Sequence, residues 1–162
     1  MADPKDQKII AAIVTRMQTI LTANGYQTNN GTRVADSRPN WDQTELPAIS
    51  VFQGRAESQE QSNASRKTVH EMPVMIKVFL ERGTDASNAR IAIADVKKAI
   101  RGTGSQSDNY LAERWPASGI GLAMMTRETA YSIEYAEGTF EITGAQVEIA
   151  VQFITDKFNA EQ

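Results

Sequence analysis

The chain has one histidine, His70, and this is the first residue whose chemistry could support catalysis, because imidazole titrates near neutral pH. Glu71 follows it directly, so a base–carboxylate pair is conceivable. However, the surrounding residues predict a β-strand, and adjacent strand residues point to opposite faces of a sheet. These two side chains therefore cannot form a dyad with each other. A triad would need partners from elsewhere, and the sequence contains no Gly-x-Ser-x-Gly nucleophile motif.

Three carboxylates, Glu134, Glu137 and Glu141, flank a predicted turn and are the next candidates for acid–base chemistry. A pair of carboxylic acids can hydrolyse a glycosidic bond only at a defined separation, in a cleft lined for sugars. No pattern in the sequence indicates such a cleft, so we interpret these side chains as solvated turn residues. The glycine pairs at 102–104 and 119–121 do not extend into a dinucleotide- or phosphate-binding motif.

The absence of cysteine excludes disulfide bonds, thiolate catalysis and cysteine-ligated zinc. With a single histidine, a zinc site would depend almost entirely on carboxylates, which is unusual. We therefore expect no catalytic, cofactor-binding or metal-ligating residues, and we expect that the chain is not an enzyme.

Length and charge narrow the class of protein further. The 162 residues fit one domain spanning residues 1–162. The net charge of −3 argues against a protein that wraps DNA, which would need a basic face. The charge is uneven, because residues 119–162 hold two basic and seven acidic side chains. No apolar run approaches the roughly 20 residues that span a bilayer, and residues 1–8 lack the pattern of a signal peptide, so we expect a non-secreted protein without a membrane partner.

Helical periodicity predicts a first helix from Pro4 to Ala23, with Asn24-Gly25 as its stop. Asn-Gly between short β-prone segments then indicates a hairpin centred on residues 29–31. Residues 35–45 are predicted to form an irregular connection. This connection contains Trp41, which we expect to cover the edge of its own core or to anchor an interface.

Two strands are predicted next, at residues 46–52 and 69–80, where side chains of different character alternate. Between them, residues 55–67 are almost entirely polar and cannot bury enough surface to offset the entropy lost on ordering. We expect this segment to be a mobile loop, or the tip of an extended β-hairpin that becomes ordered against a partner. A second helix is predicted from Asp85 to Arg101, and Gly102 ends it.

The remaining residues predict β-structure, with strands at 120–126 and 131–135 and a long final strand at 140–155 that is bulged at Gly144. One face of the final strand is lined by Val147, Ile149, Val151 and Phe153. The predicted fold class is α+β, a mostly antiparallel β-sheet with two main helices packed on one face, plus an extended β-hairpin.

This order of elements resembles that of the tail-terminator, or tail-completion, proteins of long-tailed bacteriophages. The resemblance is carried by the amphipathic first helix, the strand entered through Leu46-Pro47-Ala48-Ile49-Ser50-Val51, the polar excursion, the strand Val69 to Leu80, the helix Asp85 to Arg101 and the terminal strands ending Val147-Glu148-Ile149-Ala150-Val151. It covers most of the chain. It is a likeness of layout and size, and it includes no diagnostic motif.

The resemblance implies a structural virion protein of the tail or neck, made in the host bacterial cytoplasm. Such proteins form a ring, usually a hexamer, at the head-proximal end of the tail tube. The ring ends polymerisation of the tail tube protein and joins the tail to the head–tail connector or stopper protein, and a sheath protein is a further partner in some tails. DNA only passes through the lumen of the ring, which the acidic C-terminal third would suit.

A ring requires a head-to-tail interface between copies. The projecting hairpin is the first candidate for this interface, and pairing of sheet edges across subunits is the second. The candidate interface residues are Arg55, Glu57, Glu60, Arg66, Lys67 and Trp41. Two other functions stay open, a head–tail connector or neck (head-completion) protein of a phage, and a small hydrolase or ligand-binding domain.

Overall fold

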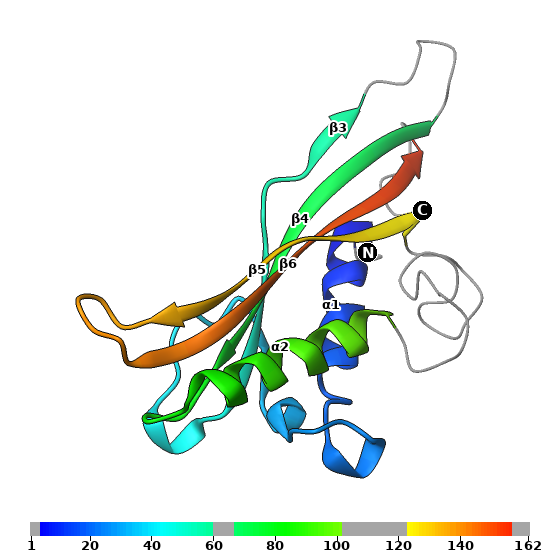
Figure 1. The fold of residues 1–162 in the computed structure, drawn as a ribbon. Helices are drawn as coiled ribbons and strands as arrows, with labels where there is room; N and C mark the ends of the chain where they lie inside the picture. The colour runs from blue at the N-terminus through cyan, green and yellow to red at the C-terminus, as the bar shows by residue number, and fades with distance from the viewer. Residues whose placement is uncertain (1–3, 60–66, 102–122, 157–162) are drawn as a thin grey trace.

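The computed structural model describes residues 4–59, 67–101 and 123–156, which form one mixed six-stranded sheet and two long helices (Figure 1). The elements in chain order are α1 (Lys5–Met17), η1 (Thr22–Asn24), η2 (Asn30–Thr32), β1 (Val34–Asp36), η3 (Gln43–Glu45), β2 (Ala48–Gln53), β3 (Glu57–Gln59), β4 (Lys67–Phe79), α2 (Ala86–Arg101), β5 (Met125–Tyr135) and β6 (Ile142–Asp156). The strand order is β1-β2-β4-β6-β5, and β3 pairs with β4 outside this path. Only the β1–β2 pair is parallel. The α+β class with a mostly antiparallel sheet is confirmed.

The core lies between the helices and one face of the sheet. Neighbouring strands place Val51, Ile76 and Val147 in one row across this face, and all three are buried. Both helices contribute to the same apolar cluster, α1 through residues such as Ile13 and α2 through residues such as Val96. Burying a side chain of this size contributes about 1.5–3 kcal/mol, so the alternation along β4 and β6 fixes which face meets the helices.

Helix α2 has a clear start and one unexpected buried charge. Its first turn is capped by Asp85, whose carboxylate accepts the Asn88 N–H at 2.8 Å. Further along, Asp95 is only 1% exposed. Its carboxylate accepts the backbone N–H groups of Gln27 (3.1 Å) and Thr28 (2.8 Å) and the Thr28 hydroxyl (2.7 Å). The segment between η1 and η2 is therefore tied to α2 by a buried carboxylate.

Two predictions about the first forty residues are wrong. The first helix ends at Met17, well before Ala23, because the chain turns there into short 3-10 segments. Residues 29–31 form no hairpin turn, since Asn30–Thr32 is a 3-10 turn and β1 then pairs in parallel with β2. Gly31 is present for a close approach, because a Cβ there would lie 2.5 Å from the Met17 carbonyl oxygen. The glycine of this Asn-Gly pair is therefore needed for close packing against the end of α1, and not for a hairpin turn.

The C-terminal half differs from the prediction at one strand. The predicted strands at 120–126 and 131–135 are replaced, within the described residues, by the single strand β5, which carries a bulge between Glu128 and Ala130. The bulge allows the strand to continue through the polar residues 127–129 while it stays paired with β6. The bulge predicted at Gly144 is confirmed, since the register moves from Glu134↔Gly144 to Tyr135↔Ile142. A Cβ at Gly144 would lie 2.6 Å from the Val78 carbonyl oxygen.

The predicted long hairpin is only partly described. β3 pairs antiparallel with the outer part of β4, from Glu57↔Glu71 to Gln59↔Val69, so residues 57–59 are a strand and not a loop. Residues 60–66 lie outside the described residues, and the hairpin tip stays a prediction. No helix in the described ranges is long and apolar enough to cross a membrane.

Candidate interaction surface

His70 has a structural environment. Its Nε2 lies 2.8 Å from the Thr155 hydroxyl, and its ring stacks on Phe153 with 5.1 Å between centroids. Both partners belong to β6, the strand next to its own. The histidine therefore fastens the outer ends of β4 and β6 together.

Glu71 points to the opposite face of the sheet, as predicted. Its carboxylate accepts hydrogen bonds from Gln152 (2.8 Å) and Arg127 (2.9 Å). These two contacts, the Gln152 hydrogen bond first, lower the pKa of Glu71 below its ordinary value. His70 and Glu71 have separate partners and form no dyad.

The turn carboxylates are also kept apart by separate cations. Glu134 pairs with Lys77 at 2.7 Å, and Glu141 pairs with Arg82 at 2.7 Å. Glu137 is exposed on the β5–β6 turn and has no ion pair within the described part of the chain. The acidic surplus counted from the sequence is thus offset in space by cations of β4 and of the turn before α2. The charge argument for an acidic lumen is weaker than the sequence count implied.

Trp41 covers its own sheet. Its indole Nε1 donates to the Ser50 hydroxyl at 2.8 Å, and that hydroxyl donates to the Arg38 carbonyl at 2.7 Å. The Arg38 guanidinium lies over the indole ring, 3.9 Å from its centroid. Ser50 is fully buried although it lies on the face away from the helices. Trp41 therefore covers β2 on the face opposite to the core, and not the edge of the core as expected. Its interface role stays a prediction.

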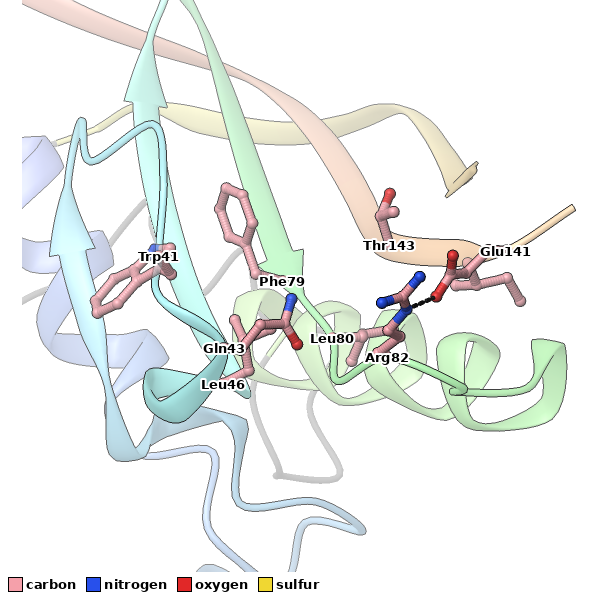
Figure 2. Close-up of a pocket in the computed structure, with 9 residues that line it drawn as sticks. Trp41, Gln43, Leu46, Phe79, Leu80, Arg82, Glu141 and Thr143 are labelled. Carbon is pink, nitrogen blue, oxygen red and sulfur yellow. Dashed lines mark hydrogen bonds and ion pairs between the residues drawn. The ribbon is translucent and has the colours of Figure 1, made fainter. Parts of the chain in front are cut away.

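Next to Trp41 lies an open groove, shown in Figure 2, with a volume of about 390 Å³. We call it the Trp41 groove. Its lining consists of Trp41, Gln43, Leu46, Phe79, Leu80, Arg82, Glu141, Ile142 and Thr143. The Arg82–Glu141 ion pair lies on one side and Trp41 on the other, with Phe79 between them (Figure 2). The lining is apolar apart from this pair and two neutral polar side chains, so the groove suits an apolar group.

The candidate interface residues of the hairpin are only partly described. Arg55, Glu57 and Lys67 are exposed where β3 and β4 begin, and Glu60 and Arg66 lie outside the described residues. Lys67 is close enough to Lys5 of α1 to affect it. The pKa of Lys5 is lowered by burial first, then by the charges of Lys8 and Lys67.

The exposed large apolar side chains of the described residues gather at one edge of the sheet. They are Met124, Met125, Tyr131, Tyr135 and Phe140, all on β5 or beside it. β5 pairs with β6 on one side only, so its other side is the edge of the sheet. A long edge strand that displays aromatic side chains is a template for contact with another chain.

An open groove of about 560 Å³ runs between α2 and β5, and we call it the α2–β5 groove. Its lining residues are Arg90, Ile93, Ala94, Lys97, Tyr131, Ser132, Ile133 and Tyr135. The three alternate residues from β5 are on the face that carries the core, since Tyr131 pairs with Val147 and Ile133 with Ala145. The groove is the strip of that face that α2 does not reach.

Charged side chains order one wall of the α2–β5 groove. Lys97 pairs with Glu128 at 2.8 Å and lies over the Tyr131 ring, 3.3 Å from its centroid. Arg101 reaches the same glutamate at 2.9 Å. Arg90, about two turns before Lys97 and three before Arg101 on α2, is exposed and has no ion pair in the described ranges. This wall is therefore held in place by ion pairs near Lys97, and it carries an exposed guanidinium at Arg90.

The sequence analysis missed the aromatic edge. A signal was present, because Tyr131, Ile133 and Tyr135 alternate at the spacing of a strand. Whether such a stripe is covered depends on how far a helix extends across the sheet, and α2 contacts β5 through Lys97 and Arg101 but leaves Tyr131 and Tyr135 largely exposed. Phe140, next to the turn glycine Gly138, gave no periodic signal.

No group of three or more histidine, aspartate or glutamate side chains that could hold a metal ion occurs among the described residues. The sequence matches no protein-family model, and no curated protein has significant sequence similarity to it.

Proposed function

We propose that this chain is a structural subunit that works by binding copies of itself and other proteins. The observation that carries the proposal is the aromatic edge at β5. Tyr131 is 60% exposed and Tyr135 53%, on a strand whose outer hydrogen-bonding groups have no partner strand in the described structure. Phe140, on the turn that follows β5, is 97% exposed. Exposed aromatic side chains on one edge are costly in a chain that acts alone, because they promote non-specific association.

Within this class, we propose a ring at the head-proximal end of a phage tail tube. Support comes from the order of elements in the sequence, which resembles that of tail-terminator proteins, and from a mostly antiparallel sheet with two helices. The partners would be further copies of the chain, most simply six, the tail tube protein, and the connector or stopper protein of the head. The ring would end tube polymerisation and let DNA pass through its lumen.

The first test is the mass of the purified full-length protein, measured by sedimentation velocity and native mass spectrometry over a range of concentrations. A ring-former associates into a defined closed oligomer. Negative-stain images of the protein mixed with tail tubes should then show it at one end of each tube and nowhere along its length.

Two results would redirect the proposal. Rings that bind purified head connectors but ignore tail tubes would assign the chain to the neck. A chain that stays monomeric at all concentrations, with and without tail tubes, would overturn the proposed association.

A further inference from the structure

We infer that Phe140 on the β5–β6 turn of one copy inserts into the α2–β5 groove of a second copy, and that this head-to-tail contact joins neighbours in the ring. The inference rests on the proposed function, since only an associating subunit needs such a contact. The residues that line the α2–β5 groove then form one half of the interface, and the β5–β6 turn with Phe140 forms the other half.

The projecting half is a well-ordered turn. The β5–β6 hairpin extends beyond α2 at the left of Figure 1. Phe140 belongs to the turn of this hairpin, between Tyr135 and Ile142. The turn is closed by hydrogen bonds from the Ala136 N–H to the Glu141 carbonyl (2.8 Å) and from the Thr139 N–H to the Ala136 carbonyl (3.1 Å). The Thr139 hydroxyl also accepts the Glu141 N–H at 3.1 Å. Phe140 is therefore presented by a preorganised backbone, which reduces the entropy lost on binding.

The receiving half has the chemistry that an aromatic ring needs. Ile93, Ala94 and Ile133 supply an apolar floor, and Tyr131 and Tyr135 supply aromatic walls. Burial of an exposed phenylalanine side chain in such a site is favourable, and aromatic contacts add to that. The volume of about 560 Å³ leaves room for one ring and its flanking backbone.

Charge complementarity identifies a second copy as the occupant. Glu137 shares the turn with Phe140, and Arg90 lies at the rim of the groove. Both are exposed, and neither has an ion pair within the described part of the chain. The same chain thus carries an apolar knob, Phe140, beside the exposed carboxylate of Glu137. It also carries an apolar groove beside the exposed guanidinium of Arg90. Phe140 and the groove are formed by different residues, so each copy can give one and receive the other, and such a contact makes a ring when its rotation closes.

Disulfide trapping tests the contact directly, since the chain contains no cysteine and any disulfide must come from introduced residues. One variant carries Thr139→Cys on the turn, and another carries Ala94→Cys in the groove. Mixed under mild oxidation, the two should form a covalent dimer, because a disulfide requires Cα atoms about 4.4–6.8 Å apart. A chain carrying both substitutions should give a ladder of covalent oligomers that ends at the size of the ring.

The matched control replaces the groove residue with an exposed alanine on the other helix, Ala11→Cys. Mixed with the Thr139→Cys variant, it should give no dimer. Adding Phe140→Ser to the trapping pair should lower the yield of dimer about tenfold or more, since the knob is then lost.

Several outcomes would overturn the contact. Dimers from the Thr139→Cys variant alone would indicate that two turns meet. A mixture that remains monomeric would mean that the turn of one copy does not enter the groove of another. If wild-type rings are seen but no disulfide forms, the contact is wrong and the proposed function stands. If there are neither rings nor disulfides, the proposed function fails as well.

A charge exchange gives an independent check. Arg90→Glu alone and Glu137→Arg alone should each weaken self-association about tenfold or more, because each places like charges at the rim. The chain with both substitutions should recover most of the lost affinity. Failure of the double variant to recover, with normal folding of both single variants, would overturn the pairing of these two residues.

Discussion

The two edges of the sheet are built in opposite ways. β1 has three residues, packs against the start of the chain and contributes Val34 to the margin of the core. β5 has eleven residues, most of them exposed, and displays two tyrosines. Proteins commonly protect an edge by making it short or by covering it, and β1 shows both devices. Among the residues that the structure describes, β5 is neither short nor covered, and its one bulge leaves most of the strand able to pair.

The contrast between the two edges predicts which edge takes part in association with other chains. A chain that needed only solubility would protect both edges, because either one can pair with another molecule. Here the protection around β1 involves a buried aspartate, a glycine against backbone and a tryptophan hydrogen-bonded to a buried serine. Stability and interaction are thus separated, so changes near β1 should affect folding and changes at β5 should affect assembly.

The largest effect is expected from Asp95→Ala. The substitution leaves the N–H groups of Gln27 and Thr28 and the Thr28 hydroxyl without their acceptor in a partly buried site. An unsatisfied donor costs about 1–3 kcal/mol when it is buried, and we expect these three partly buried donors together to lower the free energy of unfolding by about 4 kcal/mol, measured by urea denaturation. Asp95→Asn, which keeps one acceptor oxygen, should lose about half as much. If both variants unfold like the wild type, the hydrogen bonds between Asp95 of α2 and the segment leading to β1 do not contribute to the free energy of unfolding.

Gly31→Ala should have the next largest effect. The new methyl group would lie 2.5 Å from the Met17 carbonyl oxygen and 2.9 Å from the Ile20 nitrogen, and both are backbone atoms that cannot move aside cheaply. We expect a loss of about 3 kcal/mol in thermal or urea unfolding. Gly25→Ala is the matched control. Its φ of 84° is strained for alanine but no atom lies within 4 Å of the new group, so it should cost about 1–2 kcal/mol. A larger loss from Gly25→Ala would contradict the packing explanation.

Asp95 and Gly31 also show what the sequence can and cannot predict. Local periodicity located both helices and the alternation that buries Val74, Ile76 and Val78 in β4. It placed the bulge at Gly144. It misread Gly31, because the atoms that require a glycine there belong to the end of α1, a tertiary neighbour that propensity does not record. It missed Asp95 for the same reason, since the groups that bind this carboxylate are 67 and 68 residues away in sequence.

The candidate interaction surface was less predictable than the fold. Edge pairing was among the expected modes of association, but the charged hairpin around Arg55 and Glu57 was the first candidate. The exposed tyrosines of β5 resemble core residues in a sequence, because alternation shows which side chains share a face and not whether that face is covered. Only the position of α2 across the sheet reveals that Tyr135 remains open.

A smaller effect on stability is expected when matched substitutions are made at the two edges. Tyr135→Thr at the open edge keeps a residue that suits a strand, and it should change the free energy of unfolding by less than about 0.5 kcal/mol. It should nevertheless reduce self-association in sedimentation experiments. Val34→Thr at the protected edge should cost about 1 kcal/mol because a partly buried methyl group becomes a hydroxyl, and it should leave association unchanged. The reverse pattern would mean that the two edges have been assigned the wrong roles.

The smallest effect is a pH dependence on the covered side, at Glu45 of η3. Its carboxylate accepts the Asp42 N–H and pairs with Arg38, and these contacts, the backbone hydrogen bond first, lower its pKa below the ordinary value. A carboxyl group with a lowered pKa in the folded state stabilises the fold above its unfolded pKa of about 4.3, and this contribution is lost as the pH falls through the folded value. The difference in unfolding midpoint between wild type and Glu45→Gln should therefore be constant near neutral pH.

Below the usual carboxyl range this difference should shrink and then disappear, because the wild-type side chain is then protonated as well. Thermal unfolding of both proteins at a series of pH values measures it. Glu137→Gln is the control for removing one exposed carboxylate, because Glu137 lies on the β5–β6 turn without an ion pair among the described residues. Its effect should instead be found in self-association near neutral pH. A Glu45→Gln difference that grows as the pH falls would have the wrong sign for a carboxylate held by Asp42 and Arg38, and would show that this contact does not stabilise the covering of the β1 side.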